Sequence, residues 1–359
     1  MKVAIIGLAN AGKTTVFNAL TGQHVETTIY PTTSGDPHVG TVKVPDSRLD
    51  SLSAVFKPKK TTHATIEYID SIGLTKGDIK QNRKVFDLIK DADAIVQVVR
   101  LFDNDAVIHP LGTVNASRDI ETVELELIFG DLEFIEKRLE RMEEGVKRGK
   151  KPDESEKKFL LKCRDTLMKE FPLRNLDFTG EDLQVMRPLQ FLSTIPEIVV
   201  LNHGEQDIGS GTEKFLFKEL SARYRETPFL PLCGKIEMEI AQLSLADRKM
   251  FLDDMGLNEP AAHKLIQACF DLLGLISFFT YAGDEVRAWT IKRGTPAQKA
   301  AGKVHSDIER GFIRAEVISF DDFISAGDIH NARGKGLARL EGKTYEVKDG
   351  DVINFRFNV

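Results

Sequence analysis

A glycine-rich turn within the first fourteen residues constrains the fold more than any other feature of the sequence. Residues 7–14 read GLANAGKT, which fits the pattern G-x-x-x-x-G-K-[ST]. The preceding run VAIIG predicts a buried strand, and the following TVFNAL predicts a helix. Between a strand and a helix, such a turn presents backbone N–H groups and the positive end of the helix dipole to an anion. The sequence therefore predicts a phosphate-binding loop (P-loop) in an α/β domain.

Four positions have specific roles in this interpretation. We expect Lys13 to reach the β- and γ-phosphates of a nucleotide and Thr14 to bind Mg²⁺. A second strand pattern, ATIEYID, ends at Asp70, where the sequence D-S-I-G begins. A carboxylate there holds Mg²⁺ through water, and the N–H of Gly73 meets the γ-phosphate. The alternatives are a glycine turn with a solvated Lys13 and an ordinary turn aspartate at position 70, and finding both motifs together favours the nucleotide site.

The order of helical and strand patterns predicts the domain organisation. Strand and helix patterns alternate up to residue 115, which is typical of a parallel sheet covered by helices. Helical periodicity then runs on both sides of the Gly- and Lys-rich stretch 145–157 and predicts a helical hairpin inserted at about 118–195. A strand pattern returns at EIVVL, and short alternating runs begin near residue 276. We expect a P-loop domain over 1–275, interrupted by the hairpin, and a β-rich domain over 276–359.

Composition narrows the classes of partner. The formal net charge of −6 argues against nonspecific binding of nucleic acid, so we expect no DNA partner and only local contacts with RNA. No apolar stretch reaches the ~20 residues that a membrane-spanning helix needs, and no signal peptide is evident. The three cysteines form no closely spaced pair. We therefore expect a cytoplasmic protein with reduced thiols and no membrane association.

Motifs along nearly the whole chain resemble the YchF, or Obg-like ATPase, family. They are GLANAGKT, DSIGLTKG, the NHGE that begins at residue 202, and the C-terminal EVRAWTIKRGT and AAGKVHSDIERGFIRAEV. The resemblance implies a G domain of the translation-factor class, a coiled-coil insertion, and a C-terminal TGS domain of ubiquitin-like β-grasp fold. It also implies hydrolysis of ATP in connection with ribosomes.

The segment Asn202, His203, Gly204, Glu205 bears on the choice between ATP and GTP. GTPases of this class recognise guanine with N-K-x-D, whose aspartate accepts two hydrogen bonds from the base. The longer Glu205 displaces the carboxylate, and a misplaced polar partner costs ~1–3 kcal/mol. The resembled family carries N-x-x-E here and prefers ATP, which agrees with this argument. The alternative is a loop in which Asn and Glu are incidental.

A nucleotide-binding set follows from these motifs and from the loop LCGKIEMEI, which resembles the family's second base-side loop. We expect Cys233 to pack as a small buried residue without chemistry of its own. The predicted nucleotide-binding residues are Asn10, Ala11, Gly12, Lys13, Thr14, Thr15, Asn202, His203, Glu205, Cys233 and Gly234.

The catalytic residues are less completely specified. The glutamine that orients the attacking water in many relatives of this class is replaced by Leu74, so we expect slow hydrolysis until a partner completes the site. Lys13, Asn10 and Gly73 are the predicted catalytic residues. Asn10 either helps to bind a monovalent cation such as K⁺ or is a turn residue.

The first switch region is expected between Thr27 and His38. Its hydroxyl ligand to Mg²⁺ is assigned to Ser34, with the adjacent Thr33 as the alternative, so that the metal set is Thr14, Ser34 and Asp70. After Gly77 the sequence DIKQNRKVF replaces the glycine-rich stretch that the resemblance leads one to expect.

A basic run, Lys147 to Lys151, lies at the expected tip of the hairpin. It is either a contact for ribosomal RNA or a solvated loop. The C-terminal domain has 13 Lys and Arg against 12 Asp and Glu, so its charge alone indicates no nucleic-acid clamp. The sequence favours a ribosome-associated regulatory ATPase. A nucleotide-gated binding module with negligible hydrolysis is the alternative, and Glu205 opposes a GTPase proper.

Overall fold

The computed structural model describes residues 1–27, 36–151, 153–208 and 212–358. The chain forms two compact units. The first contains Met1–Thr41 and Glu67–Leu265, and the second contains Val42–Ile66 and Ile266–Val359. This division differs from the boundary expected at 275/276, chiefly because residues 42–66 join the C-terminal unit.

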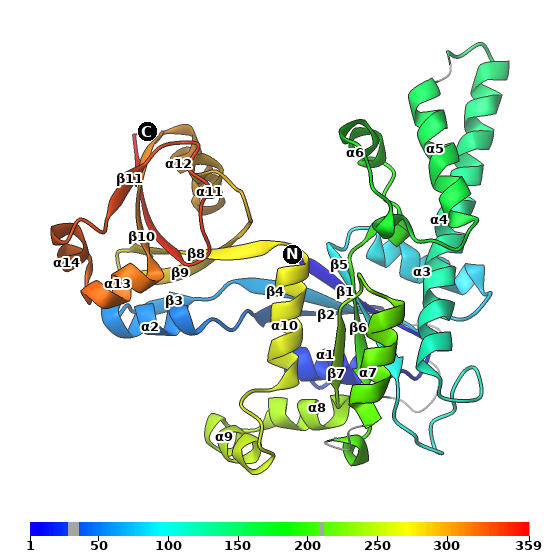
Figure 1. Ribbon diagram of the computed structural model, residues 1–359, viewed down its shortest axis with the longest axis horizontal. Helices are drawn as coiled ribbons and strands as arrows, with labels where there is room; N and C mark the ends of the chain where they lie inside the picture. Colours follow the sequence, from blue (N-terminus) through cyan, green and yellow to red (C-terminus); the bar gives the residue numbers. More distant parts are fainter. Residues whose placement is uncertain (28–35, 152, 209–211, 359) are drawn as a thin grey trace. The chain divides into compact units, whose positions relative to one another are not determined.

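A six-stranded sheet forms the centre of the first unit (Figure 1), and its strands follow the order β2-β4-β1-β5-β6-β7. β4, β1, β5, β6 and β7 pair in parallel. Every residue of β5 and β6 is buried, as expected for strands that are covered on both faces. The carboxyl ends of these strands meet at one edge, where open α/β sheets bind their ligands. The strands are β1 (Lys2–Ile6), β2 (His38–Lys43), β4 (Thr65–Asp70), β5 (Ala94–Arg100), β6 (Glu197–Asn202) and β7 (Phe229–Leu232).

Helices follow the strands of this sheet and cover it. α3 and α4 pack on one face through Val85, Val123 and Leu127, which contact Ile6 and Ile95 of the sheet. α1 begins directly after the P-loop and contacts α8. The helices of this part of the chain, including those of the insertion described next and α10, which continues into the second unit, are α1 (Lys13–Thr21), α3 (Ile79–Ile89), α4 (Ala116–Lys147), α5 (Glu154–Leu167), η1 (Leu173–Asn175), α6 (Gly180–Met186), η2 (Leu192–Thr194), η3 (Glu205–Asp207), α7 (Thr212–Arg223), α8 (Gly234–Gln242), α9 (Leu245–Asp254) and α10 (Ala261–Leu272).

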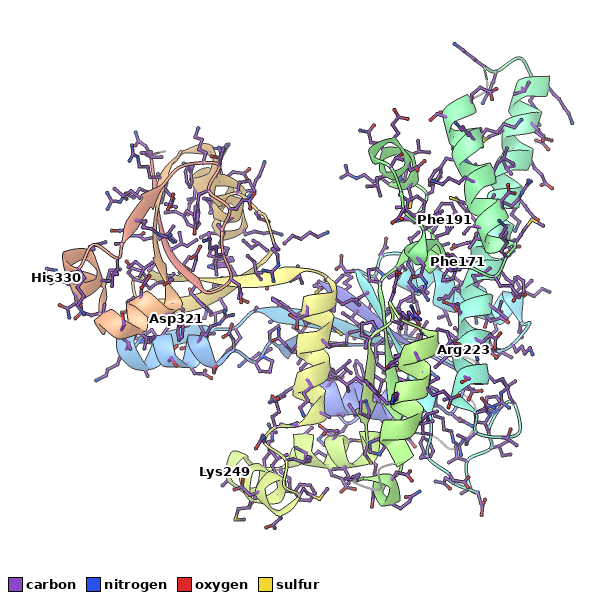
Figure 2. All side chains as sticks on the ribbon, in the orientation of Figure 1. Phe171, Phe191, Arg223, Lys249, Asp321 and His330 are labelled. Carbon is purple, nitrogen blue, oxygen red and sulfur yellow. The ribbon has the colours of Figure 1, made fainter. Side chains whose placement is uncertain are left out.

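The predicted helical insertion is confirmed as the hairpin of α4 and α5, which run side by side in Figure 1. Asn115 and Asp153 cap their amino ends by accepting hydrogen bonds from backbone N–H groups. A separate apolar cluster holds the two helices to the segment that precedes β6. Figure 2 labels two residues of this segment, Phe171 and Phe191, of which Phe191 belongs to the cluster. Its buried members are Ile128, Ile135, Phe159, Leu160, Cys163, Leu167, Leu173, Leu189 and Phe191.

A buried carboxylate, Asp131, fixes the end of this insertion. It accepts hydrogen bonds from the N–H groups of Leu192 and Ser193 at 2.8 Å each and from the Ser193 hydroxyl at 2.6 Å. Burial raises the pKa of Asp131 to about 6, although these donors and the charge of Arg174 act in the opposite direction. The side chain thus joins α4 to η2, which leads into β6.

The second unit contains a mixed sheet with the order β11-β10-β12-β8-β9-β3. β8 and β9 form an antiparallel hairpin, β12 lies parallel to β8, and β10 is antiparallel to β12, an arrangement consistent with the β-grasp fold. Residues of α11 pack against one face of this sheet. The elements are β3 (Lys60–Thr62), β8 (Leu275–Ala282), β9 (Glu285–Lys292), β10 (Phe312–Ser319), β11 (Arg339–Glu341), β12 (Asp351–Phe357), α2 (Ser47–Phe56), α11 (Ala297–Val304), α12 (Ser306–Arg310), α13 (Phe320–Ala326) and α14 (Ile329–Gly334).

Specific contacts explain why residues 42–66 belong to this second unit. β3 pairs in parallel with β9, and Phe56 at the end of α2 stacks on the rings of Tyr281 and Phe323. Arg48 also forms an ion pair with Asp349 at 2.8 Å. The local sequence pattern, which continues the strand and helix alternation of the first domain, contains no sign of these distant partners. Among the residues that the structure describes, no helix combines the length and apolar character needed to cross a membrane.

Candidate nucleotide-binding site

The P-loop connects β1 to α1, and its two outer glycines adopt backbone conformations that favour glycine. Gly7 has φ 146° and Gly12 has φ 92°. Space is limiting as well. A Cβ at Gly7 would lie 2.4 Å from the carbonyl oxygen of Val98, and a Cβ at Gly12 would lie 2.2 Å from Nδ2 of Asn202. The motif glycines therefore allow the loop to pack directly against β5 and the end of β6.

Lys13, the first residue of α1, is buried under the P-loop with 7% of its surface exposed. Its ammonium donates a hydrogen bond to the carbonyl oxygen of Leu8 at 2.9 Å. Burial lowers the pKa of Lys13 to about 8, and the attraction of Asp70 partly offsets this effect. The side chain follows the inner side of the loop, where the motif requires a cation for phosphates.

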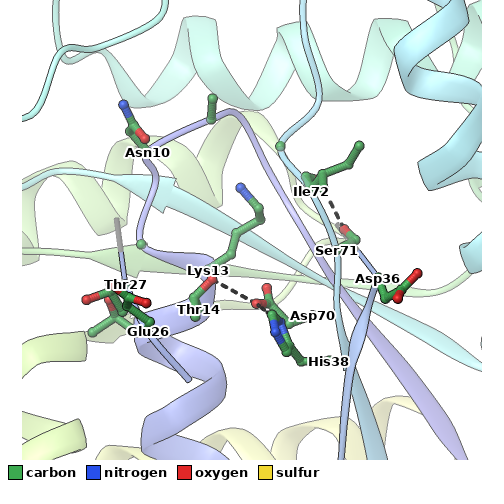
Figure 3. A pocket seen from close by; sticks show the side chains of 14 residues that line it. Asn10, Lys13, Thr14, Glu26, Thr27, Asp36, His38, Asp70, Ser71 and Ile72 are labelled. Carbon is green, nitrogen blue, oxygen red and sulfur yellow. Dashed lines mark hydrogen bonds and ion pairs between the residues drawn. The ribbon is translucent and has the colours of Figure 1, made fainter. Parts of the chain in front are cut away.

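Thr14 and Asp70 meet beside the P-loop (Figure 3). The hydroxyl of Thr14 donates to Oδ2 of Asp70 at 2.8 Å, although the two residues are 56 positions apart in sequence. Burial raises the pKa of Asp70, against the hydrogen bond from Thr14 and the charges of Lys13 and His38. His38 reaches the same carboxylate, with Nδ1 at 3.7 Å from Oδ2.

The donor set at this point fits Mg²⁺. Oδ1 of Asp70 is buried and has no hydrogen-bond partner among the described residues, and a hard cation satisfies such an oxygen. The described residues contain no cluster of three or more His, Cys, Asp and Glu side chains that could hold a metal by themselves. A site of one hydroxyl and one carboxylate is typical of P-loop proteins, in which the nucleotide supplies further ligands. The predicted third ligand Ser34, and its alternative Thr33, lie outside the described residues.

Gly73 lies directly against the P-loop. A Cβ at this position would be 2.6 Å from Cα of Ala9, so only glycine permits the approach. The neighbouring Leu74 is fully buried and joins the core under the sheet. Its side chain has no polar atom to hold a water molecule, as the sequence predicted. Gln81 of α3 donates to the carbonyl oxygen of Gly73 at 3.3 Å, which holds this segment to the helix.

The P-loop and the segment that begins at Asp70 line a cleft of about 250 Å³. Thr27, Asp36 and His38, which belong to the expected first switch region, contribute to its wall, as does the preceding residue Glu26. The full lining is Ala9, Asn10, Gly12, Lys13, Thr14, Thr15, Glu26, Thr27, Asp36, His38, Asp70, Ser71, Ile72 and Gly73.

A second cavity, of about 570 Å³, lies beside the first and shares Asn10, Gly12, Thr15 and Thr27 with it. The loops after β5, β6 and β7 form most of its wall, and it contains the predicted base-side residues Asn202, His203, Glu205 and Cys233. We refer to this cavity as the base pocket. It is lined by Asn10, Gly12, Thr15, Thr27, Phe102, Asp103, Asn104, Val107, Asn202, His203, Gly204, Glu205, Gln206, Cys233, Lys235 and Met238.

Asn202 links three parts of the site. Its Nδ2 donates to the carbonyl oxygen of Ala11 at 3.0 Å, and its Oδ1 accepts from the N–H of Gly234 at 3.0 Å. The P-loop, the end of β6 and the start of α8 are thereby joined through one buried amide. Cys233 packs at the same junction, and burial raises the pKa of its thiol, which agrees with the packing role expected for it.

The loop after β5 was missed in the sequence analysis. Phe102, Asn104 and Val107 line the base pocket. The buried Arg100 organises them by donating to the carbonyl oxygens of Phe102, Asn104 and Val107 at 3.1, 3.3 and 2.9 Å. An arginine at the end of a buried strand that is apolar apart from Gln97 was the available signal.

The same loop reaches the phosphate side through Asn10. This residue has φ 59°, a conformation that asparagine tolerates better than most residues, and its Nδ2 donates to the carbonyl oxygen of Ile108 at 2.9 Å. The geometry supports a turn role for Asn10, and its predicted role with K⁺ stays a prediction. Nearby, buried His109 is held by Asp119 at 2.9 Å and by the N–H of Leu111.

Comparison with known proteins gives a consistent result. A family model described as a 50S ribosome-binding GTPase matches residues 2–129, and the YchF-GTPase C-terminal model, described as a protein of unknown function, matches residues 275–358. The chain is similar to the "Ribosome-binding ATPase YchF" of Bacillus subtilis, with 41% identity and all of both chains covered. It is similar to the Escherichia coli protein of the same name, with 40% identity over 100% of this chain and 99% of the relative.

A solved structure agrees with these sequence matches. The structure titled as that of the Schizosaccharomyces pombe YchF GTPase superimposes with a TM-score of 0.84 at 27% identity. The match covers 99% of this chain and 97% of the other. The predicted combination of a P-loop α/β domain, a long helical insertion and a YchF-type C-terminal domain is therefore confirmed.

Proposed function

Because the chain belongs to the YchF family, we propose that it is a ribosome-associated P-loop ATPase that hydrolyses ATP to ADP and phosphate in the cytoplasm. The full-length relatives carry the name ribosome-binding ATPase, and they match the chain from end to end. We assign residues 276–359, which make up most of the second unit, as the TGS domain of this family.

The observation that carries the proposal is the arrangement around the P-loop. Lys13 lies buried under the loop, and Thr14 and Asp70 meet at 2.8 Å beside it. In P-loop nucleotide hydrolases, a lysine at this place contacts the β- and γ-phosphates, and the hydroxyl and the carboxylate bind Mg²⁺ directly or through water. When bound, Mg²⁺ neutralises part of the phosphate charge. The N–H of Gly73 is assigned to the γ-phosphate.

The choice of ATP over GTP rests on the base pocket. Glu205 occupies the place of the aspartate that recognises guanine in N-K-x-D proteins, and its longer side chain displaces the carboxylate. Asn202 is already engaged with Ala11 and Gly234, so we assign it to holding the pocket together and, through its remaining capacity, to contacting the base. The relatives are named ATPases, whereas the S. pombe structure is titled a GTPase, so base choice must be measured.

Multiple-turnover phosphate release with and without ribosomes tests the proposal. We expect slow, Mg²⁺-dependent turnover of ATP that increases when ribosomes are added, because buried Leu74 provides no group to orient the attacking water. Tight ATP binding without turnover under both conditions would instead support a nucleotide-gated binding module. Repeating the assay in K⁺ and in Na⁺ tests whether a monovalent cation contributes at Asn10.

Ribosome association is assigned first to the tip of the hairpin. Lys147, Lys150 and Lys151 are exposed near the end of α4, where they are free to contact phosphates of RNA. Deleting Gly149 to Lys151 should weaken co-sedimentation with ribosomes and leave basal ATP turnover unchanged. Equal co-sedimentation of both forms would reject this assignment, and the second unit would then be the next candidate.

A further inference from the structure

An exposed ion pair lies on the rim of the base pocket, and the roles assigned above do not use it. Nζ of Lys235 lies 2.6 Å from Oε1 of Glu205. Glu205 begins η3 directly after β6, and Lys235 lies in the first turn of α8 after β7. Because β6 and β7 are neighbouring parallel strands, their following loops meet at the same edge of the sheet.

The pair has little to do with folding. The side chains of Lys235 and Glu205 are 66% and 47% exposed, and ion pairs between exposed side chains contribute little to the free energy of folding. Both residues nevertheless line the base pocket. A change at either position should therefore alter the chemistry of the pocket more than the stability of the protein.

We propose that Lys235 is a specificity-determining residue: by pairing with Glu205 it keeps this carboxylate from serving as the acceptor for guanine and so favours ATP. This inference rests on the proposed function, since it assumes that the pocket binds the base of a nucleotide. It assigns the preference to the pair of residues and not to the length of Glu205 alone.

Hydrogen-bond chemistry gives the reason. Guanine offers a carboxylate two donors, the ring N1–H and the exocyclic amine, and both of its oxygens are needed to accept them side by side. The ammonium of Lys235, which has donors only, engages Oε1 and places a positive charge beside the partly positive N–H groups of guanine. Adenine needs only one acceptor for its amine, and its N1 is itself an acceptor that suits a neighbouring ammonium.

A second carboxylate lines the described part of the pocket and must be held constant in a test. Asp103 lies in the loop after β5. If it stays unchanged in every variant, its contribution to ATP and GTP binding cancels when variants are compared by their ratio of affinities.

The test measures the affinities of non-hydrolysable ATP and GTP analogues with Mg²⁺, by competition against a fluorescent nucleotide. The proteins are the wild type, Lys235→Met, Glu205→Gln and the double variant. Methionine keeps much of the lysine stem and removes the charge. Lys249→Met is the matched control, because Lys249 is an exposed lysine on the neighbouring helix α9 (Figure 2) and does not line the pocket.

We expect Lys235→Met to reduce the ratio of ATP to GTP affinity about ten-fold, mainly through tighter GTP binding, as recovery of one charged hydrogen bond allows. In the Glu205→Gln background the same substitution should leave the ratio unchanged, because no carboxylate remains to be released. Lys249→Met should match the wild type.

Two results would overturn the inference: an unchanged ratio in Lys235→Met, or an equal change of the ratio with and without Glu205. Failure of the premise taken from the proposed function, that this site binds a nucleotide, looks different, since the wild type would then bind neither ATP nor GTP. Binding without turnover would contradict the ATPase activity but would leave the ratio of affinities, and so this inference, measurable. The unchanged ratio includes the case in which both nucleotides weaken equally, which would mean that Lys235 acts on the phosphates that ATP and GTP share.

Discussion

The phosphate side and the base side of the site are built in different ways. Around the phosphates, Lys13 and Asp70 are buried and Thr14 is partly buried, and Gly7, Gly12 and Gly73 allow backbones to pack closely. Around the base, loops from three strands meet, and the polar groups on the rim are exposed. A local sequence motif can therefore specify phosphate binding, whereas base choice depends on side chains that only the fold brings together.

The strongest test of this contrast removes the phosphate-side cation. Lys13→Ala should weaken ATP binding about 100-fold or more, because an ammonium aimed at the phosphates is lost. ATP and GTP should be affected equally, since the two share their triphosphate. Isothermal titration with both nucleotides measures this change.

Thermal unfolding serves as the control for Lys13→Ala. The substitution removes a buried charge whose desolvation opposes folding, so the variant should stay folded at a similar melting temperature. Wild-type ATP affinity in a folded variant would contradict the assignment of the P-loop as the phosphate site.

Removing the hydrogen bonds that hold the loop after β5 tests whether this loop contributes to binding of the base. Arg100→Met removes three hydrogen bonds that hold the carbonyl groups of Phe102, Asn104 and Val107, and we expect about ten-fold weaker ATP binding. Tripolyphosphate, which carries no base, should bind nearly as it does to the wild type, and competition with both ligands measures the difference. If both ligands weaken equally, the loop acts mainly through its contact with Asn10, and the two sides are not separable.

Shortening Glu205 by one methylene tests whether the length of this side chain sets the preference between ATP and GTP. Glu205→Asp should shift the preference toward GTP by about ten-fold, or ~1–2 kcal/mol, because the carboxylate moves nearer the position that accepts the guanine donors. Competition binding of ATP and GTP gives the ratio directly. A wild type that already prefers GTP, or an unchanged ratio in the variant, would show that Asn202 to Glu205 is not the base-reading segment.

The smallest effect on nucleotide binding is expected from a substitution of Asp131, which lines neither the phosphate cleft nor the base pocket. Because its pKa in the folded protein is raised to about 6, the stability that it contributes is present at low pH and is lost as the pH rises through 6. Asp131→Asn lacks this titration and places an NH₂ group among three donors. It should therefore lower the free energy of unfolding more at pH 4 than at pH 7, with ATP affinity nearly unchanged.

Denaturant unfolding across this pH range checks the sign. The opposite trend, a larger cost at pH 7, would show that the three hydrogen bonds to Asp131 outweigh its burial. A large loss of ATP affinity in a folded variant would show that the insertion and the nucleotide site are coupled.

The sequence predicted the parts of the molecule whose causes are local. The P-loop, the D-S-I-G segment and the helical hairpin follow from motif and periodicity, and Leu74 is as unsuited to holding water in the structure as in the sequence. The sequence analysis did not predict that residues 42–66 belong to the C-terminal unit, because contacts such as the stacking of Phe56 on Tyr281 join residues more than 200 positions apart. Phe102 was missed as a base-pocket residue for the same reason, and Lys235 was not singled out within the predicted base-side loop LCGKIEMEI. Strand-end loops become neighbours only when the order of the sheet is known.

The amide of Asn202 determines how this site can be re-engineered. It contacts Ala11 and Gly234, and it leaves no room for a side chain at Gly12. Positions 11, 12, 202 and 234 therefore behave as one block in a mutant library, where a change at any of them damages the framework for every nucleotide. Positions 205 and 235 are exposed and lie outside that block. A library randomised at these two positions alone can therefore vary the preference between ATP and GTP while the fold of the site is kept.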